Sequence, residues 1–153
     1  APGRVVTLVR APAALCRGVA YRVNEDVFDH LDHREKNGYE RHRSRLYLDH
    51  RGQTVSGTFY IAGPDNPAFL GDGDDAELAR HIADSHGPSG SNAEYLLRLA
   101  ASLRELGEHD EHVTSLEREL LRLRPELAAD GYQGTPVQAR PNSWAAGKQR
   151  SRS

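Results

Sequence analysis

The hydrophobic pattern changes its period near residue 63, and this change constrains the fold more than any other feature of the sequence. Before it, apolar side chains alternate or form short runs, which predict strands over residues 5–9, 15–23, 39–48 and 54–62. After it, apolar residues recur at three- and four-residue spacing, which is typical of amphipathic helices. Strands followed by helices predict an α+β fold whose strands form an antiparallel sheet or a small barrel.

Capping residues mark the expected helices. Asn24 can cap a short helix over residues 25–33. Asp74 and Glu77 form a capping-box pattern for a helix that ends near residue 85. Asn92 can cap the next helix, which extends to residue 106, with Gly107 at the position after its C-cap. A last helix begins near residue 110.

Length and composition favour one domain. We assign it residues 1–127, and we expect residues 128–153 to be a disordered tail because apolar periodicity stops there. The net charge of −2 gives no support for a nucleic-acid or membrane-surface partner. No apolar run approaches the roughly 20 residues that a membrane span needs. The single Cys16 cannot form an internal disulfide, which favours a cytoplasmic location.

Other residues raise possibilities that the pattern itself does not favour. His30 and His33 are three apart, as are His109 and His112, whereas the common helical zinc motif spaces its histidines four apart around a Glu. We therefore expect no metal site and interpret these histidines as solvated. Ser89, in a glycine-rich loop, either hydrogen-bonds the backbone or contacts a substrate.

Glu35 is the candidate proton carrier. It follows the short helix in a run of charged residues that leads into the strand over residues 39–48. A carboxylate held beside apolar groups has a raised pKa and can transfer protons. By pattern alone, a charge run at a helix end is more simply a solvated face.

Taken together, short motifs along the chain resemble the ChaC branch of the γ-glutamylcyclotransferases, over roughly residues 2–124. The matching pieces are Pro2-Gly3-Arg4-Val5-Val6-Thr7-Leu8, Gly18-Val19-Ala20-Tyr21-Arg22, Leu31-Asp32, Arg34-Glu35-Lys36, Gly38-Tyr39, Tyr60-Ile61, Asp65-Asn66-Pro67, Leu70-Gly71, Gly87-Pro88-Ser89-Gly90, Asn92 and Glu94-Tyr95-Leu96. No single piece is specific, but their order and spacing together are.

The resemblance implies a compact β-barrel of the γ-glutamylcyclotransferase type with flanking helices. It implies cleavage of glutathione to 5-oxoproline and cysteinylglycine without a cofactor, and it matches the family's catalytic glutamate to Glu35. The family's N-terminal Tyr-Gly-Ser-Leu motif, whose backbone cradles the γ-glutamyl group, does not occur in this sequence. We therefore expect the chain to be N-terminally truncated and to lack the first strand.

The remaining site assignments are substrate contacts. Tyr95 and Asn92 begin a helix that can face the cavity, although Tyr95 can equally be a half-buried aromatic residue. Arg34 and Arg4 can pair with a glutathione carboxylate, and the simpler interpretation of Arg34 is a surface ion pair. Ser89 completes the set. Two other functions stay open: a catalytically impaired or non-catalytic γ-glutamyl-binding module, and a cyclotransferase for other γ-glutamyl amines.

Overall fold

The structure is a computed structural model, and it describes residues 3–34, 38–48, 52–67, 69, 71, 73–87 and 90–129. The chain divides into two compact units. The first consists of Ala1–Arg4 with Gly73–Ser153, and the second of Val5–Asp72. This division concerns packing, so the single domain that we assign to residues 1–127 stays a prediction.

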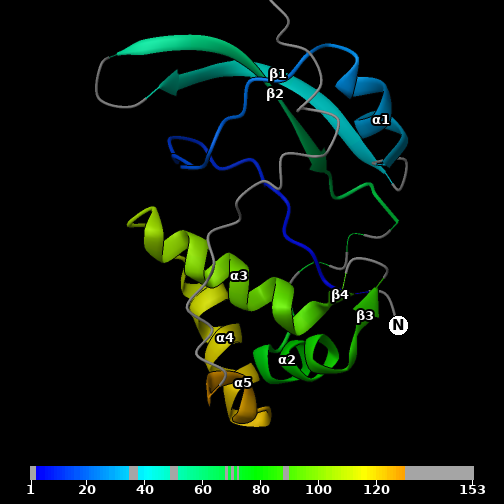
Figure 1. Cartoon of the computed structure of the whole chain (residues 1–153), viewed down its shortest axis with the longest axis vertical. Helices are drawn as coiled ribbons and strands as arrows, with labels where there is room; N and C mark the ends of the chain where they lie inside the picture. The colour runs from blue at the N-terminus through cyan, green and yellow to red at the C-terminus, as the bar shows by residue number, and fades with distance from the viewer. Residues whose placement is uncertain are drawn as a thin grey trace, which may run out of the picture. The chain divides into compact units, whose positions relative to one another are not determined.

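A long hairpin dominates the second unit. Strands β1 (Tyr39–Leu48) and β2 (Gln53–Ala62) pair antiparallel over their whole length, from Tyr39 opposite Ala62 to Leu48 opposite Gln53 (Figure 1). Both strands are confirmed close to their predicted bounds. Helix α1 (Val27–Arg34) lies two residues later at its start than expected, and its Val27 is buried.

The two strands predicted over residues 5–9 and 15–23 are wrong. The described backbone there pairs in no ladder, and apolar side chains such as Val5 and Leu15 are 59% and 86% exposed. A strand needs a neighbour for its N–H and C=O groups, and β1 and β2 pair only with each other. Each sheet in the described part of the chain therefore has two strands, and these residues show no closed barrel.

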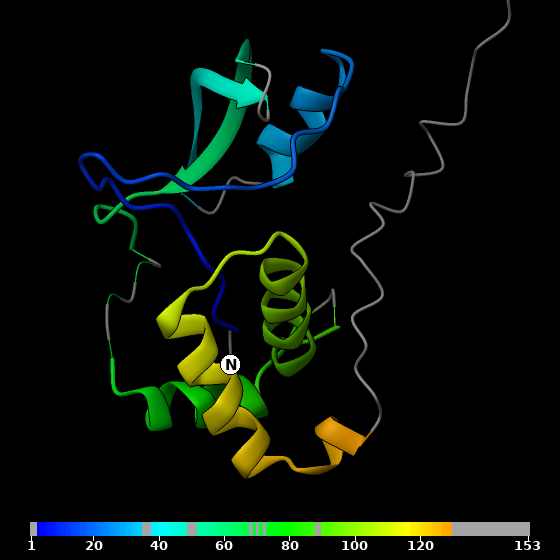
Figure 2. The same cartoon turned by 90° about the vertical axis from the view of Figure 1, so that its left-hand side faces the viewer.

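Helices build the first unit. They are α2 (Asp75–Asp84), α3 (Asn92–Glu105), α4 (Glu111–Leu123) and α5 (Glu126–Ala129), with a minimal hairpin of β3 (His86–Gly87) and β4 (Gly90–Ser91) between α2 and α3 (Figure 2). Helix α5 includes residues 128 and 129, the first two residues of the predicted disordered tail. Residues 130–153 of the predicted tail lie outside the described residues.

Each long helix begins with the same cap. The side chains of Asp74, Ser91 and Asp110 accept a hydrogen bond from the backbone N–H three residues later, at 3.0, 3.1 and 2.8 Å. The predicted cap of α3 was Asn92, and this is wrong by one residue. The Ser91 hydroxyl reaches the free N–H of Glu94, whereas the Asn92 amide bonds elsewhere.

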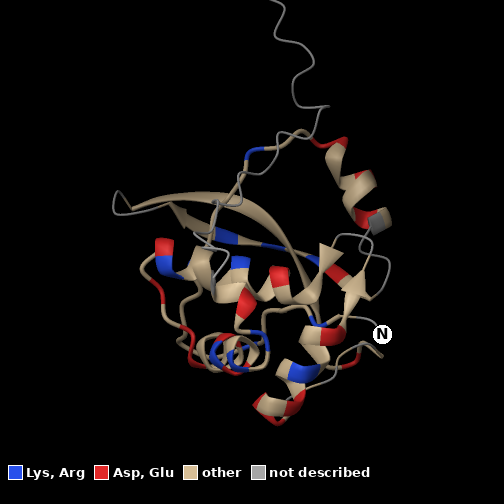
Figure 3. Ribbon diagram, turned by 60° about the horizontal axis from the view of Figure 1, so that its bottom comes forward, with Lys and Arg blue, Asp and Glu red and all other residues tan. Residues whose placement is uncertain are grey.

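The core of this unit lies where α2, α3 and α4 meet. Its buried members are Ile82, Ala93, Leu96, Leu97, Ala100, Val113, Leu116 and Leu120. A bidentate ion pair between Arg104 and Glu117, at 2.7 and 3.1 Å, joins α3 to α4 at the edge of the core. Acidic and basic residues otherwise occur on the helices and on the hairpin alike (Figure 3). Within the described residues, no helix has the length and apolar character needed to cross a membrane.

Gly107 ends α3 in a left-handed conformation, with φ of +70°. The N–H of Glu108 donates to the carbonyl of Leu103 at 2.9 Å, and the N–H of Gly107 donates to the carbonyl of Arg104 at 3.0 Å, which together form a Schellman motif.

Gly107→Ala is expected to lower the free energy of unfolding by about 1–2 kcal/mol, the usual cost of placing a Cβ in this conformation. Urea denaturation measures it. Gly87→Ala is the control, because Gly87 has no positive φ and open space around its Cα. Equal effects of the two substitutions would contradict the prediction.

Candidate active site

The structure describes some of the predicted site residues and not others. Glu35 and Ser89 lie outside the described residues, and so does the side chain of Arg34, the last residue of α1. Arg4, Asn92 and Tyr95 are described and belong to the helical unit. The described surroundings of Glu35, in the hairpin unit, and of Asn92, in the helical unit, are therefore considered one unit at a time.

On the N-terminal side of Glu35, Asp32 ties α1 to the hairpin. The Tyr60 hydroxyl donates to Asp32 Oδ1 at 2.6 Å, and Arg41 Nη1 lies 3.0 Å from Asp32 Oδ2. Arg41 and Tyr60 are directly opposite in the β1–β2 register, so both reach the same carboxylate. The Arg41 guanidinium also lies over the Phe28 ring, 5.4 Å from its centroid.

On the C-terminal side, Gly38 is held by Asn66. Asn66 Nδ2 donates to the Gly38 carbonyl at 3.1 Å. Gly38 has a φ of +91°, and a Cβ there would lie 2.7 Å from the Asn66 side chain, so the position requires glycine. Contacts to the hairpin and its following loop thus hold the chain three residues before and three residues after Glu35.

The pKa of Tyr60 is raised above its ordinary value of 10.0. Burial is the main cause, followed by the hydrogen bond to Asp32 and its negative charge, while the positive charge of Arg41 acts in the opposite direction. Tyr60 is therefore a protonated donor at neutral pH, and the Asp32 carboxylate has two donors from the hairpin.

Tyr60→Phe is expected to lower the free energy of unfolding by about 1–2 kcal/mol at pH 7, because it removes a hydrogen bond to a charged acceptor. A phenol whose folded pKa is raised stabilises the fold below its unfolded pKa and loses this contribution as pH rises through the folded pKa. The difference between wild type and Tyr60→Phe should thus shrink above pH 10 in urea titrations. Tyr47→Phe, at a residue that is 71% exposed, is the control. A difference that is constant with pH would contradict the assignment.

Asn92 lies in the helical unit and is bonded to Arg4. Its Oδ1 accepts from the Arg4 N–H at 2.6 Å and its Nδ2 donates to the Arg4 carbonyl at 2.7 Å. The residue is 7% exposed. Tyr95, 37% exposed, follows one turn later on α3. The structure therefore brings Arg4 and Asn92 together through the Arg4 main chain, and the substrate contacts assigned to these three residues stay predictions.

Sequence reasoning missed the roles of Asp32, Arg41, Tyr60 and Asn66. Two of them could have been found, because extending the predicted hairpin inward from its turn places Arg41 opposite Tyr60, on the face that carries Tyr39. The contact of Asn66 with Gly38 joins two loops and has no periodic signal in the sequence.

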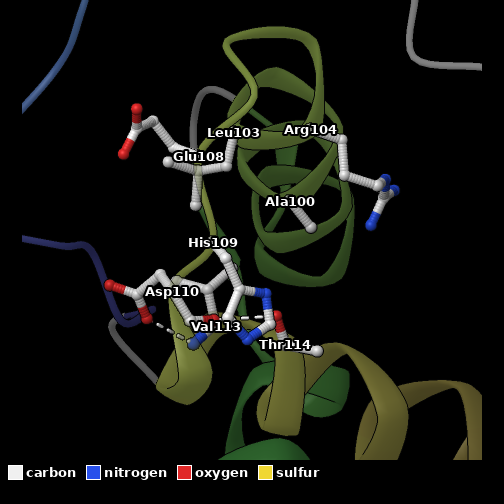
Figure 4. Close-up of a pocket in the computed structure, with 8 residues that line it drawn as sticks. All are labelled: Ala100, Leu103, Arg104, Glu108, His109, Asp110, Val113 and Thr114. Carbon is white, nitrogen blue, oxygen red and sulfur yellow. Dashed lines mark hydrogen bonds between the residues drawn. The ribbon is translucent and has the colours of Figure 1, made fainter.

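A shallow hollow of about 130 Å³ lies at the turn between α3 and α4 (Figure 4). Its lining contains none of the predicted site residues. Asp110, which Figure 4 shows on its wall, caps α4 by accepting from Val113 N at 2.8 Å, and its carbonyl accepts from the Thr114 hydroxyl at 2.7 Å. These polar groups are used in capping the start of α4.

In the part of the chain that the structure describes, no three His, Cys, Asp or Glu side chains gather in a metal-binding arrangement.

Comparison with known proteins identifies the family. Residues 1–123 match the family model described as ChaC-like protein. The chain is 36% identical over 148 residues to gamma-glutamylcyclotransferase 2-3 of Arabidopsis thaliana, covering 88% of this chain and 74% of the relative. It is 39% identical over 138 residues to glutathione-specific gamma-glutamylcyclotransferase 1 of Danio rerio, covering 84% and 70%.

A solved structure agrees. The crystal structure of the yeast γ-glutamylcyclotransferase specific to glutathione superposes with a TM-score of 0.56 at 29% identity, covering 67% of this chain and 55% of that one. The chain thus spans about half the length of the yeast protein. It is an α+β protein that belongs to the ChaC-like family.

Proposed function

We propose that the chain is a cytoplasmic, glutathione-specific γ-glutamylcyclotransferase that cleaves glutathione to 5-oxoproline and cysteinylglycine. The observation that carries the proposal is the family match over residues 1–123, which includes Glu35. The relatives from Danio rerio and Homo sapiens are named for glutathione, and both are at least 36% identical to this chain. The hydrogen bonds of Asp32 and Gly38 anchor described residues on both sides of Glu35 in the sequence.

The reaction needs no nucleophile from the protein. The α-amine nitrogen of the γ-glutamyl group attacks the γ-carbonyl carbon of the same molecule and closes a five-membered lactam. The bond from that carbon to the cysteine nitrogen then breaks. Well-oriented intramolecular reactions reach effective molarities of about 10⁵–10⁸ M, so holding the substrate curled provides much of the rate.

One carboxylate can move the proton. Glu35 takes a proton from the attacking amine and returns it to the departing cysteine nitrogen, so that the proton balance closes and water is not consumed. The oxyanion that forms on the γ-carbonyl needs N–H donors, which backbone amides commonly supply. Tyr95, Arg34, Arg4 and Ser89 are our proposed contacts to the substrate.

A second candidate is a non-catalytic γ-glutamyl-binding module. It is favoured by residues 5–23, which join no strand ladder in the described part of the chain and whose large apolar side chains are exposed. A substrate wall without strand ladders would hold a substrate less rigidly than catalysis requires. The two candidates are separated by measuring both the turnover and the binding of glutathione.

The experiment is to incubate the chain with glutathione and, separately, with γ-glutamylalanine, and to quantify 5-oxoproline. Product from glutathione alone supports the proposed function. Product from both assigns the broader cyclotransferase for γ-glutamyl amines. Binding of glutathione by calorimetry without any product would overturn the enzymatic proposal in favour of the binding module.

A further inference from the structure

We propose that Asn92 is a positioning residue: it joins the segment of Arg4, the β3–β4 hairpin and the first turn of α3, which carries Tyr95. Its effect on turnover rests on the proposed function, whereas its effect on stability does not. In this role Asn92 acts through the segments that it connects, and it replaces the direct substrate contact expected from the sequence.

The first connection is to Arg4, 88 residues earlier in the chain. A side-chain amide presents one acceptor and one donor side by side, as a peptide group does, so Asn92 pairs with both main-chain polar groups of Arg4 in the way a neighbouring strand would. Because Asn92 is 7% exposed, water does not readily replace these bonds.

Gly3 allows this close approach. A Cβ at Gly3 would lie 2.8 Å from Asn92 Cγ and 2.9 Å from Asn92 Oδ1, closer than real Cβ contacts. The amide is held between Gly3, Arg4 and its own helix, and it has little room to shift.

The second connection is to the loop that contains Ser89. The Asn92 N–H donates to the Ser85 carbonyl at 2.9 Å, which closes the chain at the base of the β3–β4 hairpin. Ser85 is itself fixed, since it is 2% exposed and its hydroxyl donates to the His81 carbonyl at 2.7 Å. The two strands that flank residues 88 and 89 are therefore tied at Asn92.

The third connection is to Tyr95. Asn92 is the first residue of α3, and Ser91 provides the helix cap, which leaves the Asn92 amide for Arg4. Tyr95 follows in the first turn. A shift of Asn92 would therefore move Tyr95 and Arg4 relative to each other.

Asn92→Asp tests the donor directly. A carboxylate has nearly the same shape and still accepts from the Arg4 N–H, but it cannot donate to the Arg4 carbonyl. When protonated, it regains the donor. The ionised group would set a second acceptor 2.7 Å from the Arg4 carbonyl, and this repulsion together with burial outweighs the Arg4 N–H and the start of α3, so the folded pKa is raised above its unfolded value of about 3.9. Stability should therefore match wild type most closely below that pH and fall away as pH rises through the folded pKa.

We expect Asn92→Asp to lower kcat/KM for glutathione by about 10- to 100-fold at pH 7.5, since small misplacements cost this much, and the loss should shrink as pH is lowered. The midpoint of urea unfolding should show the same pH-dependent rescue. Asn24→Asp is the matched control, because it adds the same charge at an exposed residue. A pH-independent effect, or one equal to that of the control, would overturn the proposal.

A double-mutant cycle keeps the test independent of activity. Gly3→Ala should destabilise strongly in the wild-type background and much less in the Asn92→Ala background, because the clashing amide is then gone. Additive effects would overturn the positioning role. Non-additive stability with no turnover of glutathione by any variant, including wild type, would instead contradict the proposed function alone.

Discussion

Glu35→Gln is expected to lower kcat for glutathione cleavage by about 10²–10⁴-fold, the usual contribution of general acid–base catalysis. Glutamine keeps the shape and polarity of the side chain but cannot take a proton from the attacking amine. KM should change less than kcat, because the proposed substrate contacts lie on other residues. Initial rates of 5-oxoproline formation, measured over a range of glutathione concentrations, give both constants.

Glu40→Gln is the matched control for this substitution. Glu40 lies five residues later in β1, its side chain is 80% exposed, and its described partner is His42 at 3.6 Å. The Glu40→Gln substitution makes the same change of charge outside the proposed chemistry. It should leave kcat within about twofold of wild type, as surface substitutions commonly do. Full activity of Glu35→Gln, or equal losses in both variants, would show that Glu35 does not carry the proton.

Leu120→Ala is expected to lower the free energy of unfolding by about 2–5 kcal/mol. Leu120 is 0% exposed and lies in the cluster that α2, α3 and α4 share. Truncation removes the buried side chain and leaves a cavity that three packed helices cannot easily close. Since small domains are stable by about 5–15 kcal/mol, a loss of this size should shift the urea midpoint strongly.

Leu123→Ala provides the comparison on the same helix. Leu123 is 46% exposed, so the same chemical change removes little buried surface and should cost less than about 1 kcal/mol. Near-equal losses for Leu120→Ala and Leu123→Ala would contradict the packing of α4 described above. The two leucines are three residues apart in α4, and only their packing distinguishes them.

Local patterns predicted the elements that are stabilised locally. The hairpin β1–β2 pairs with itself, so alternation and a Gly-containing turn were enough to predict it. Asp74 and Asp110 are the N-caps of helices α2 and α4, and each of them precedes an apolar stripe. The prediction of strands over residues 5–9 and 15–23 was wrong. An alternating apolar pattern shows only that a segment is able to form a strand, and strand formation also requires a neighbouring strand with free N–H and C=O groups.

The site was harder to predict than the fold. The motif resemblance pointed to Glu35 and to Asn92, but the hydrogen bonds of Asn92 to Arg4 join residues 88 positions apart and could not be read from spacing. The same holds for Asn66 and Gly38. Asp32 shows an intermediate case: its partners follow from the hairpin register once α1 is placed on that face.

The identity of the products tests the proposed chemistry most directly. Glutathione is incubated with the chain in water enriched in ¹⁸O, and 5-oxoproline, cysteinylglycine and glutamate are quantified by mass spectrometry. Intramolecular attack predicts equal amounts of 5-oxoproline and cysteinylglycine, with no ¹⁸O in either and no glutamate. Glutamate that carries ¹⁸O would show that water attacks the γ-carbonyl, and it would contradict the cyclotransferase mechanism.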